Sequence, residues 1–276
     1  MHKTITVAMA AASLLALAAC KQTTANGNSS SNTSAAAGAE GINGTWKTDL
    51  SSVKIDTKPD EYLLKAGQFS CSTCTPPLTV AADGALHPVT RPFADHIAVK
   101  VDDDHNVTRT SQKDGKTTGE AKYTVSGDGN TLTVNFQNMA GSKTVTGSFT
   151  EARVAPAPAG AHAMSGSWKP NKFNNVSDEG LTVTFNLEGD TLHMSAPTGQ
   201  SYDAKLDGPD VPIKGDISGT TASVKKLADN SYQETDKRGG KVIDVITMTI
   251  GADGKMTGKD ENKQDGSTTT WVASKQ

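Results

Sequence analysis

The sequence predicts an all-β protein of two tandem antiparallel meander domains, each a small barrel-like sheet. Segments such as 181–187 alternate apolar and polar residues with a period of two, which is typical of strands with one wet face. Turn residues suited to tight hairpins, such as Asp114-Gly115 and Asp253-Gly254, separate these segments. Motifs of the first half also recur in the second. No segment after the N-terminal apolar run shows a sustained helical pattern.

The recurrence predicts the domain organisation. Gly44-Thr45-Trp46-Lys47 recurs as Gly166-Ser167-Trp168-Lys169, and three further motif pairs keep nearly the same separation. A separation that stays constant over four pairs indicates duplication of one unit of normal domain size. We therefore expect β domains over 42–153 and 164–276. The Pro/Ala segment 154–163 is expected to link them as an extended chain.

The N-terminal residues predict the location of the protein. Residues 1–19 have the charge, apolar run and small residues of a secretory signal peptide. The ending Leu17-Ala18-Ala19-Cys20 resembles the bacterial lipobox, which implies cleavage before Cys20 and acylation of that residue. Lys21 after the Cys then implies the outer membrane of a Gram-negative bacterium. Residues 20–41 have little to bury and are expected to form a flexible tether. An ordinary signal peptide with a chance Cys is the alternative.

The charge balance limits the partners. The 276 residues carry 27 basic and 30 acidic side chains, a net charge of −3. This is no footprint for nucleic acid or for an anionic membrane surface. Membrane attachment would come from the lipid on Cys20. We expect no nucleic-acid partner and no cofactor.

A family resemblance predicts which residues pack together in each barrel. The Gly-x-Trp opening and a basic residue in the last strand are similar to the lipocalin and fatty-acid-binding (calycin) barrels. In these the first-strand Trp packs under a basic side chain of the closing strand. The resemblance implies that Trp46 pairs with Arg153 and Trp168 with Lys275. Such a contact contributes about 0.5–2 kcal/mol. A tightly folded pair of sheets is the alternative to a barrel.

The two remaining cysteines are expected to form a local disulfide. Cys71 and Cys74 are the only thiols left if Cys20 is acylated, and the compartment outside the cytoplasm is oxidising. The repeat sets them opposite Ser195 and Thr198, so the second half lacks the pair. Two prolines follow Cys74 and exclude the helix that a thioredoxin-like redox centre needs.

Metal binding by the first half is the sharper alternative for these cysteines. Two thiolates together with His87, His96 or His105 would suit zinc or copper(I). A typical zinc pattern has two close pairs of ligands, whereas this sequence has one pair and scattered histidines.

Three function hypotheses follow. No nucleophile, metalloprotease or phosphate-loop motif is present, so we expect a protein that is not an enzyme. The leading hypothesis is an envelope lipoprotein whose β-barrel domains bind a small apolar ligand or lipid. The second is a structural or protein-interaction lipoprotein of the envelope without a ligand. The third is a metal-handling or redox lipoprotein that uses the Cys pair of the first half.

Overall fold

The computed structural model of the chain describes residues 41–276. The signal peptide predicted over 1–19, the lipidation residue Cys20 and nearly all of the tether predicted over 20–41 lie outside the described residues. The helices within 41–276 are two single 3-10 turns, η1 (Leu50–Ser52) and η2 (Asp178–Gly180). Neither is long and apolar enough to cross a membrane. The remaining regular structure is antiparallel β-sheet, which confirms the predicted fold class.

The first sheet, here called barrel 1, has ten strands in the order β5-β4-β3-β12-β11-β10-β9-β8-β7-β6. Their bounds are β3 (Asp60–Lys65), β4 (Gln68–Cys71), β5 (Leu78–Ala81), β6 (His87–Arg91), β7 (Ala94–Val101), β8 (Asn106–Lys113), β9 (Lys116–Val125), β10 (Thr131–Asn138), β11 (Val145–Ala155) and β12 (Gly166–Val176). The two edges approach each other where Asp83, just after β5, forms an antiparallel bridge with Lys100 of β7. The sheet is therefore nearly closed.

The second sheet, barrel 2, has eleven strands in the order β15-β14-β13-β1-β21-β20-β19-β18-β17-β16, with β2 also paired to β21. Their bounds are β1 (Gly44–Thr48), β2 (Lys54–Asp56), β13 (Thr182–Glu188), β14 (Thr191–Ser195), β15 (Ser201–Lys205), β16 (Val211–Pro212), β17 (Thr220–Ala228), β18 (Ser231–Arg238), β19 (Lys241–Ile250), β20 (Met256–Asn262) and β21 (Thr268–Lys275). Bridges from Ser201 to Lys214 and from Leu206 to Val224 bring its edges together.

The strands and turns form where the sequence pattern places them. In β3 every second residue is buried, and in β14 buried and half-buried residues alternate, as period-two segments require. The β8–β9 hairpin turns at Asp114 and Gly115, which both have positive φ (51° and 73°). That combination fits the tight hairpin turns that match the twist of the strands, so the turn prediction is confirmed there.

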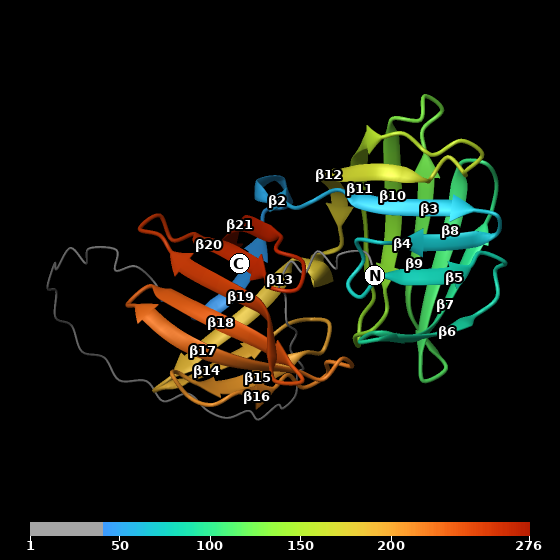
Figure 1. Cartoon of the computed structure of the whole chain (residues 1–276). Coiled ribbons are helices and arrows are strands. Elements are labelled where there is room, and N and C mark those ends of the chain that lie inside the picture. The colour runs from blue at the N-terminus through green and yellow to red at the C-terminus, as the bar shows by residue number, and fades with distance from the viewer. Residues whose placement is uncertain (1–40) are drawn as a thin grey trace, which may run out of the picture.

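The two sheets exchange a strand with respect to the two repeats. The Trp46 strand β1 lies between β21 and β13 of barrel 2, and the Trp168 strand β12 lies between β11 and β3 of barrel 1. Figure 1 shows the blue N-terminal strand among red and orange strands, and the yellow β12 beside the cyan β3. The expected domains 42–153 and 164–276 therefore do not coincide with the two barrels.

Chain connectivity explains the exchange. A Gly-x-Trp strand offers the same hydrogen bonds to either barrel, so its sequence alone does not decide which barrel it completes. Consecutive elements tend to be spatial neighbours. β12 follows β11 after a short connection and pairs with it, which fills the gap in barrel 1. The N-terminal β1 then occupies the equivalent gap in barrel 2.

The exchange also corrects the predicted pairing of Trp and basic residues. The Lys275 ammonium lies 5.4 Å from the Trp46 ring centroid, and the Arg153 guanidinium carbon lies 3.9 Å from that of Trp168. The predicted pairs Trp46 with Arg153 and Trp168 with Lys275 are thus wrong, because each Trp-bearing strand pairs with the closing strand of the other repeat unit. The cation–indole contact itself is present in both barrels.

The two Trp residues nevertheless occupy equivalent places, which supports duplication. Both are fully buried. The Trp46 indole N–H donates to Ile42 O at 2.7 Å, and the Trp168 indole N–H donates to Met164 O at 2.9 Å, each four residues upstream. Each Trp lies in the core of its barrel.

The glycine of the Gly-x-Trp motif has a steric cause. Gly44 and Gly166 have φ of 129° and 123°, a region that side chains rarely adopt. A Cβ on Gly44 would lie 2.8 Å from Cε of Lys275, and one on Gly166 would lie 2.7 Å from Nη1 of Arg153. The basic side chain can reach the indole only because no Cβ is in its way.

Candidate functional site

Cys71 and Cys74 are joined by a disulfide in barrel 1, so this prediction is confirmed. The predicted repeat position is wrong by one residue. Counted from the Gly-x-Trp strands, Cys71 occupies the position of Met194, not of Ser195. Side chains alternate between faces of a strand, so the difference matters. Cys71 and Met194 both point into their cores, whereas Ser195 is half-buried.

Reducing the disulfide is expected to leave the fold intact. The bond closes a loop of four residues, and the chain-entropy model gives about 2 kcal/mol for so short a loop. Barrel 2 builds the corresponding corner with Met194 and no disulfide. Urea unfolding with and without a reductant should show this modest loss in the free energy of unfolding. A reduced protein that no longer unfolds cooperatively would show that the disulfide holds more than this corner.

The candidate metal ligands do not come together. Nε2 of His87 lies 2.8 Å from Oδ1 of Asp83, and Nδ1 of His96 lies 2.8 Å from Oδ1 of Asp95. Nδ1 of His105 lies 3.1 Å from the carbonyl oxygen of Val125. Within residues 41–276 no group of three or more His, Cys, Asp or Glu side chains is arranged to hold a metal ion.

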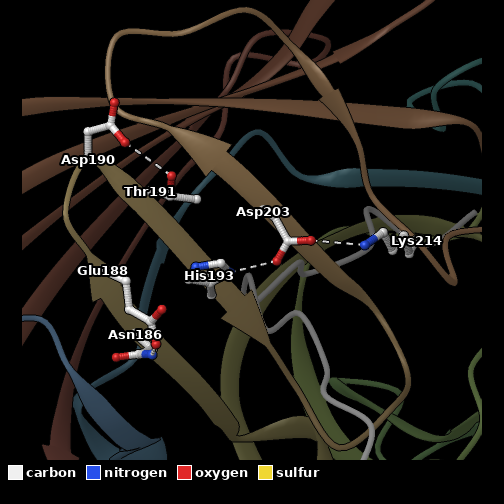
Figure 2. A network of polar contacts seen from close by, with 7 residues as sticks. All are labelled: Asn186, Glu188, Asp190, Thr191, His193, Asp203 and Lys214. Carbon is white, nitrogen blue, oxygen red and sulfur yellow. Dashed lines mark hydrogen bonds and ion pairs between the residues drawn. The ribbon is translucent and has the colours of Figure 1, made fainter.

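A polar network around His193 lies on the outside of barrel 2. Nδ1 of His193 lies 2.8 Å from Oδ1 of Asp203, whose other oxygen accepts from Lys214 Nζ at 2.9 Å (Figure 2). These hydrogen bonds hold the pKa of the Asp203 carboxyl below its usual value. The network is exposed, and the hydrogen bond that the His193 ring makes in Figure 2 is to a carboxylate. It is therefore a surface ion-pair cluster rather than a nucleophile and base.

The strongest candidate site is a cavity of about 430 Å³ between the two barrels that extends into both. In barrel 1 it is lined by residues near the β6–β7 and β8–β9 turns and the β10–β11 loop, and in barrel 2 mainly by residues of the corresponding end. Apolar side chains form much of the wall, including Phe136, Phe149, Phe173, Phe185, Met194 and Met248. The ring centroid of Phe149 lies 6.2 Å from that of Phe136 and 6.0 Å from that of Phe173.

Barrel 1 presents two arginines to the cavity. Arg91 at the end of β6 is 7% exposed, and its Nε and Nη2 are buried without a hydrogen-bond partner. Nε of Arg109 in β8 is likewise buried and without a partner, and its guanidinium carbon lies 6.0 Å from the ring centroid of Tyr123. Burial, with the like charge of Arg109, lowers the pKa of Arg91 to about 10.

Barrel 2 presents carboxyl groups instead. Glu234 and Asp236 lie in β18, Asp244 in β19 and Asp260 in β20. Asp236 stands directly opposite Asp244, and Ile246 separates Glu234 from Asp260 across three strands. The Tyr202 hydroxyl donates to Oε2 of Glu234 at 2.7 Å. Glu234, Asp236 and Asp244 line the cavity.

Burial keeps these carboxyl groups from ionising easily. It raises the pKa of Asp244 to about 6, and with the nearby acids it raises that of Asp260 to about 8. The pKa values of Asp236 and Glu234 are raised for the same first reason. One oxygen each of Asp236, Asp244 and Asp260 is buried without a hydrogen-bond partner. Like charges so close in a low dielectric are costly unless a proton or another cation compensates them.

The register shows that these charges differ between the repeats. Glu234 occupies the position of Arg109, and Asp260 that of Phe136. A side chain present in one repeat only is not required by the shared fold. The interior charges therefore differ between the two barrels at these equivalent positions.

Close contacts hold the two barrels together beside the cavity. Lys113 Nζ donates to Ile217 O at 2.7 Å, and the Ser142 amide donates to Thr198 O at 2.7 Å. The Arg238 guanidinium carbon lies 5.3 Å from the Phe93 ring centroid. A Cβ on Gly141 would lie 2.3 Å from Thr198 O, so this approach requires a glycine.

The sequence analysis singled out none of the charged cavity residues. A signal was present in the period of two, because Glu234 and Asp236 share their strand face with Tyr232, which is buried. In the same way Asp260 shares its face with the buried Met256. Charged residues on an apolar face are the pattern that would have pointed to the interior.

Comparisons with known proteins add little to this description. No family model matches the sequence, and no curated protein is significantly similar to it. One similar solved structure is a double mutant of the vaccine antigen transferrin binding protein B from Haemophilus parasuis. It has 10% sequence identity and a TM-score of 0.21, and the match covers 80% of this chain and 44% of that one. The fold described above rests on the sheets of this chain alone.

Proposed function

We propose that this chain is a non-enzymatic envelope lipoprotein that binds a small molecule with an apolar body in the cavity shared by its two barrels. The carrying observation is the cavity of about 430 Å³, whose wall is largely apolar with a few buried charged groups. Ligand sites in proteins have this size and this mixture. The lipid anchor in the proposal rests on the resemblance of residues 17–20 to the lipobox.

The other two hypotheses have less support. A purely structural lipoprotein has no need of a cavity or of buried charges without partners, since each such group destabilises the fold. A metal or redox function would use the thiolates of the first half, but both sulfurs are joined to each other. The cavity thus favours ligand binding.

A neutral fluorescent probe tests the proposal. The soluble chain is expected to enhance the fluorescence of N-phenyl-1-naphthylamine, which reports an apolar, water-poor site. Ala140→Trp should fill part of the cavity from the half-buried β10–β11 loop and weaken binding about tenfold or more, or about 1.4 kcal/mol. Ala85→Trp is the matched control, because Ala85 is exposed in a turn outside the cavity. No enhancement, or equal binding by both variants, would favour the hypothesis without a ligand.

A further inference from the structure

We propose that the ligand of this cavity is a small zwitterion, whose anionic group binds Arg91 and Arg109 in barrel 1 and whose cationic group binds Asp236 and Asp244 in barrel 2. This inference rests on the proposed function and specifies its ligand class. A short apolar peptide with free termini has the required chemistry, with a carboxylate at one end, an ammonium at the other and apolar side chains between.

The barrel 1 end is suited to an anion. A guanidinium has five N–H donors and is always charged, so burial without acceptors is strongly unfavourable. Arg91 has two such buried nitrogens and Arg109 has one, and both line the cavity. The charged group that acts most clearly on Arg91 is Arg109, which repels it. A carboxylate between them would supply the missing acceptors and relieve the repulsion.

The barrel 2 end is suited to a cation. Asp244 is 7% exposed, lines the cavity and has a buried Oδ1 without a partner. Asp236 stands opposite it and also has an unpartnered Oδ1. Arg238 is a cation that acts on both carboxyl groups; its Nη2 donates to Ser218 and Thr220, and its buried Nε has no hydrogen-bond partner. An ammonium group would add a second positive charge beside these acids, which share that of Arg238.

The two ends lie on different barrels. Arg91 and Arg109 line the cavity from barrel 1, and Asp236 and Asp244 line it from barrel 2. Opposite charges thus face one cavity. Phe136 and Phe149 of barrel 1 and Phe185 and Met248 of barrel 2 also line the cavity and offer apolar surface for the body of the ligand.

The remaining charged residues of the lining are mostly acidic: Glu120, Lys143, Glu179, Asp216, Glu234, Arg238 and Asp265. Glu120 and Lys143 are exposed, where water solvates them, and Asp216, Glu234 and Asp265 add negative charge on the barrel 2 side. The other buried acids of barrel 1, Glu151 and Asp60, do not line the cavity. The buried charge that a ligand meets is positive in barrel 1 and predominantly negative in barrel 2.

Blocked peptides test the inference by calorimetric titration of the full soluble chain. The probes are di-, tri- and tetraleucine, each with free termini, with an acetylated N-terminus and with an amidated C-terminus. At least one peptide with free termini is expected to bind, and each block should weaken it about tenfold or more. Arg91→Gln should abolish the difference between free acid and amide but keep the effect of acetylation. Asp244→Asn should do the reverse.

Controls distinguish loss of peptide binding from unfolding of a variant and from a cavity that binds no ligand at all. Lys116→Gln and Asp229→Asn change exposed charges outside the cavity and should bind like the native chain, and Arg109→Gln replaces Arg91→Gln if that variant does not fold. Blocks that have no effect, or effects that do not depend on Arg91 and Asp244, would overturn the inference. If N-phenyl-1-naphthylamine binds but no peptide does, the inference fails and the proposed function stands. If neither binds, both fail.

Discussion

A fragment spanning residues 57–177 is expected to fold on its own, whereas a fragment of residues 42–155, which contains the predicted first repeat 42–153 and all of β11, is not. Ending the fragment at the Pro/Ala linker removes β12 from barrel 1. This also removes Trp168, which is fully buried in the barrel 1 core. Losing a buried Trp alone costs about 3–5 kcal/mol, close to the whole stability of a small domain. Residues 57–177 contain every strand of barrel 1.

Circular dichroism and thermal unfolding of the two fragments provide the measurement. The 57–177 fragment should show β-sheet and a cooperative transition, and the 42–155 fragment should show neither. Residues 177–276 should fold only when a peptide of residues 42–56 is added, because β1 and β2 pair with β21. Cooperative folding of the 42–155 fragment would contradict this prediction and would mean that β1 with Trp46 can complete barrel 1 in the absence of β12.

The stability of the protein is expected to fall as pH rises from about 5 to about 8. Burial raises the pKa of Asp244 to about 6 and that of Asp260 to about 8. In the unfolded chain an Asp has a pKa near 3.9. The folded state therefore holds more protons than the unfolded state in this window, and the free energy of unfolding decreases with pH. Each group changes it by about 1.4 kcal/mol per pH unit while it titrates.

The charged groups around Asp260 raise its pKa further, as burial does. Asp244, Glu234, Asp265 and Glu261 all raise its pKa, after burial itself. The cation of this region, Arg238, lowers the pKa of Asp244. Exposed carboxyls with lowered pKa values, such as Asp203, have the opposite effect, but only below about pH 4. Maximum stability should therefore lie near pH 4–5.

Asp260→Asn checks this assignment. The variant should be more stable than the native chain at pH 8, by an amount on the order of a few kcal/mol, and should match it at pH 4. Urea unfolding across this pH range gives the comparison. Asp229→Asn is the control, because Asp229 is fully exposed and its variant should follow the native curve. A native stability that rises steadily from pH 5 to pH 8 would show that the acids of barrel 2 are ionised and compensated in the folded state.

The features that could be predicted from the sequence are those that depend on residues close together in the chain. Alternating segments, the turn at Asp114-Gly115 and the burial of Trp46 and Trp168 all follow from residue types and spacing. The disulfide followed from the spacing of two cysteines and the expected compartment. These features depend on neighbours in the chain, so a single sequence contains them.

The remaining features depend on which distant segments meet. The sequence does not show whether Trp46 packs against Arg153 or Lys275, because each basic residue lies at the same place in its own repeat. Counting from turns, rather than from strand pairing, placed Cys71 opposite the wrong residue. The opposite charges of Arg109 and Glu234 became informative only when the register set them at one position of the two barrels.

The placement of β1 also sets the order in which the molecule can mature. Two hydrogen bonds between Ser52 and Val272 join residues 220 positions apart, so they cannot form before β21 has been synthesised. Barrel 1 closes with β12 and can be complete much earlier. During that interval β1 and β2 have no partners, and an unpaired strand edge readily joins other chains. A chaperone that covers residues 42–56 would therefore be most useful late in synthesis, and closure of the long loop should be the slow step of folding.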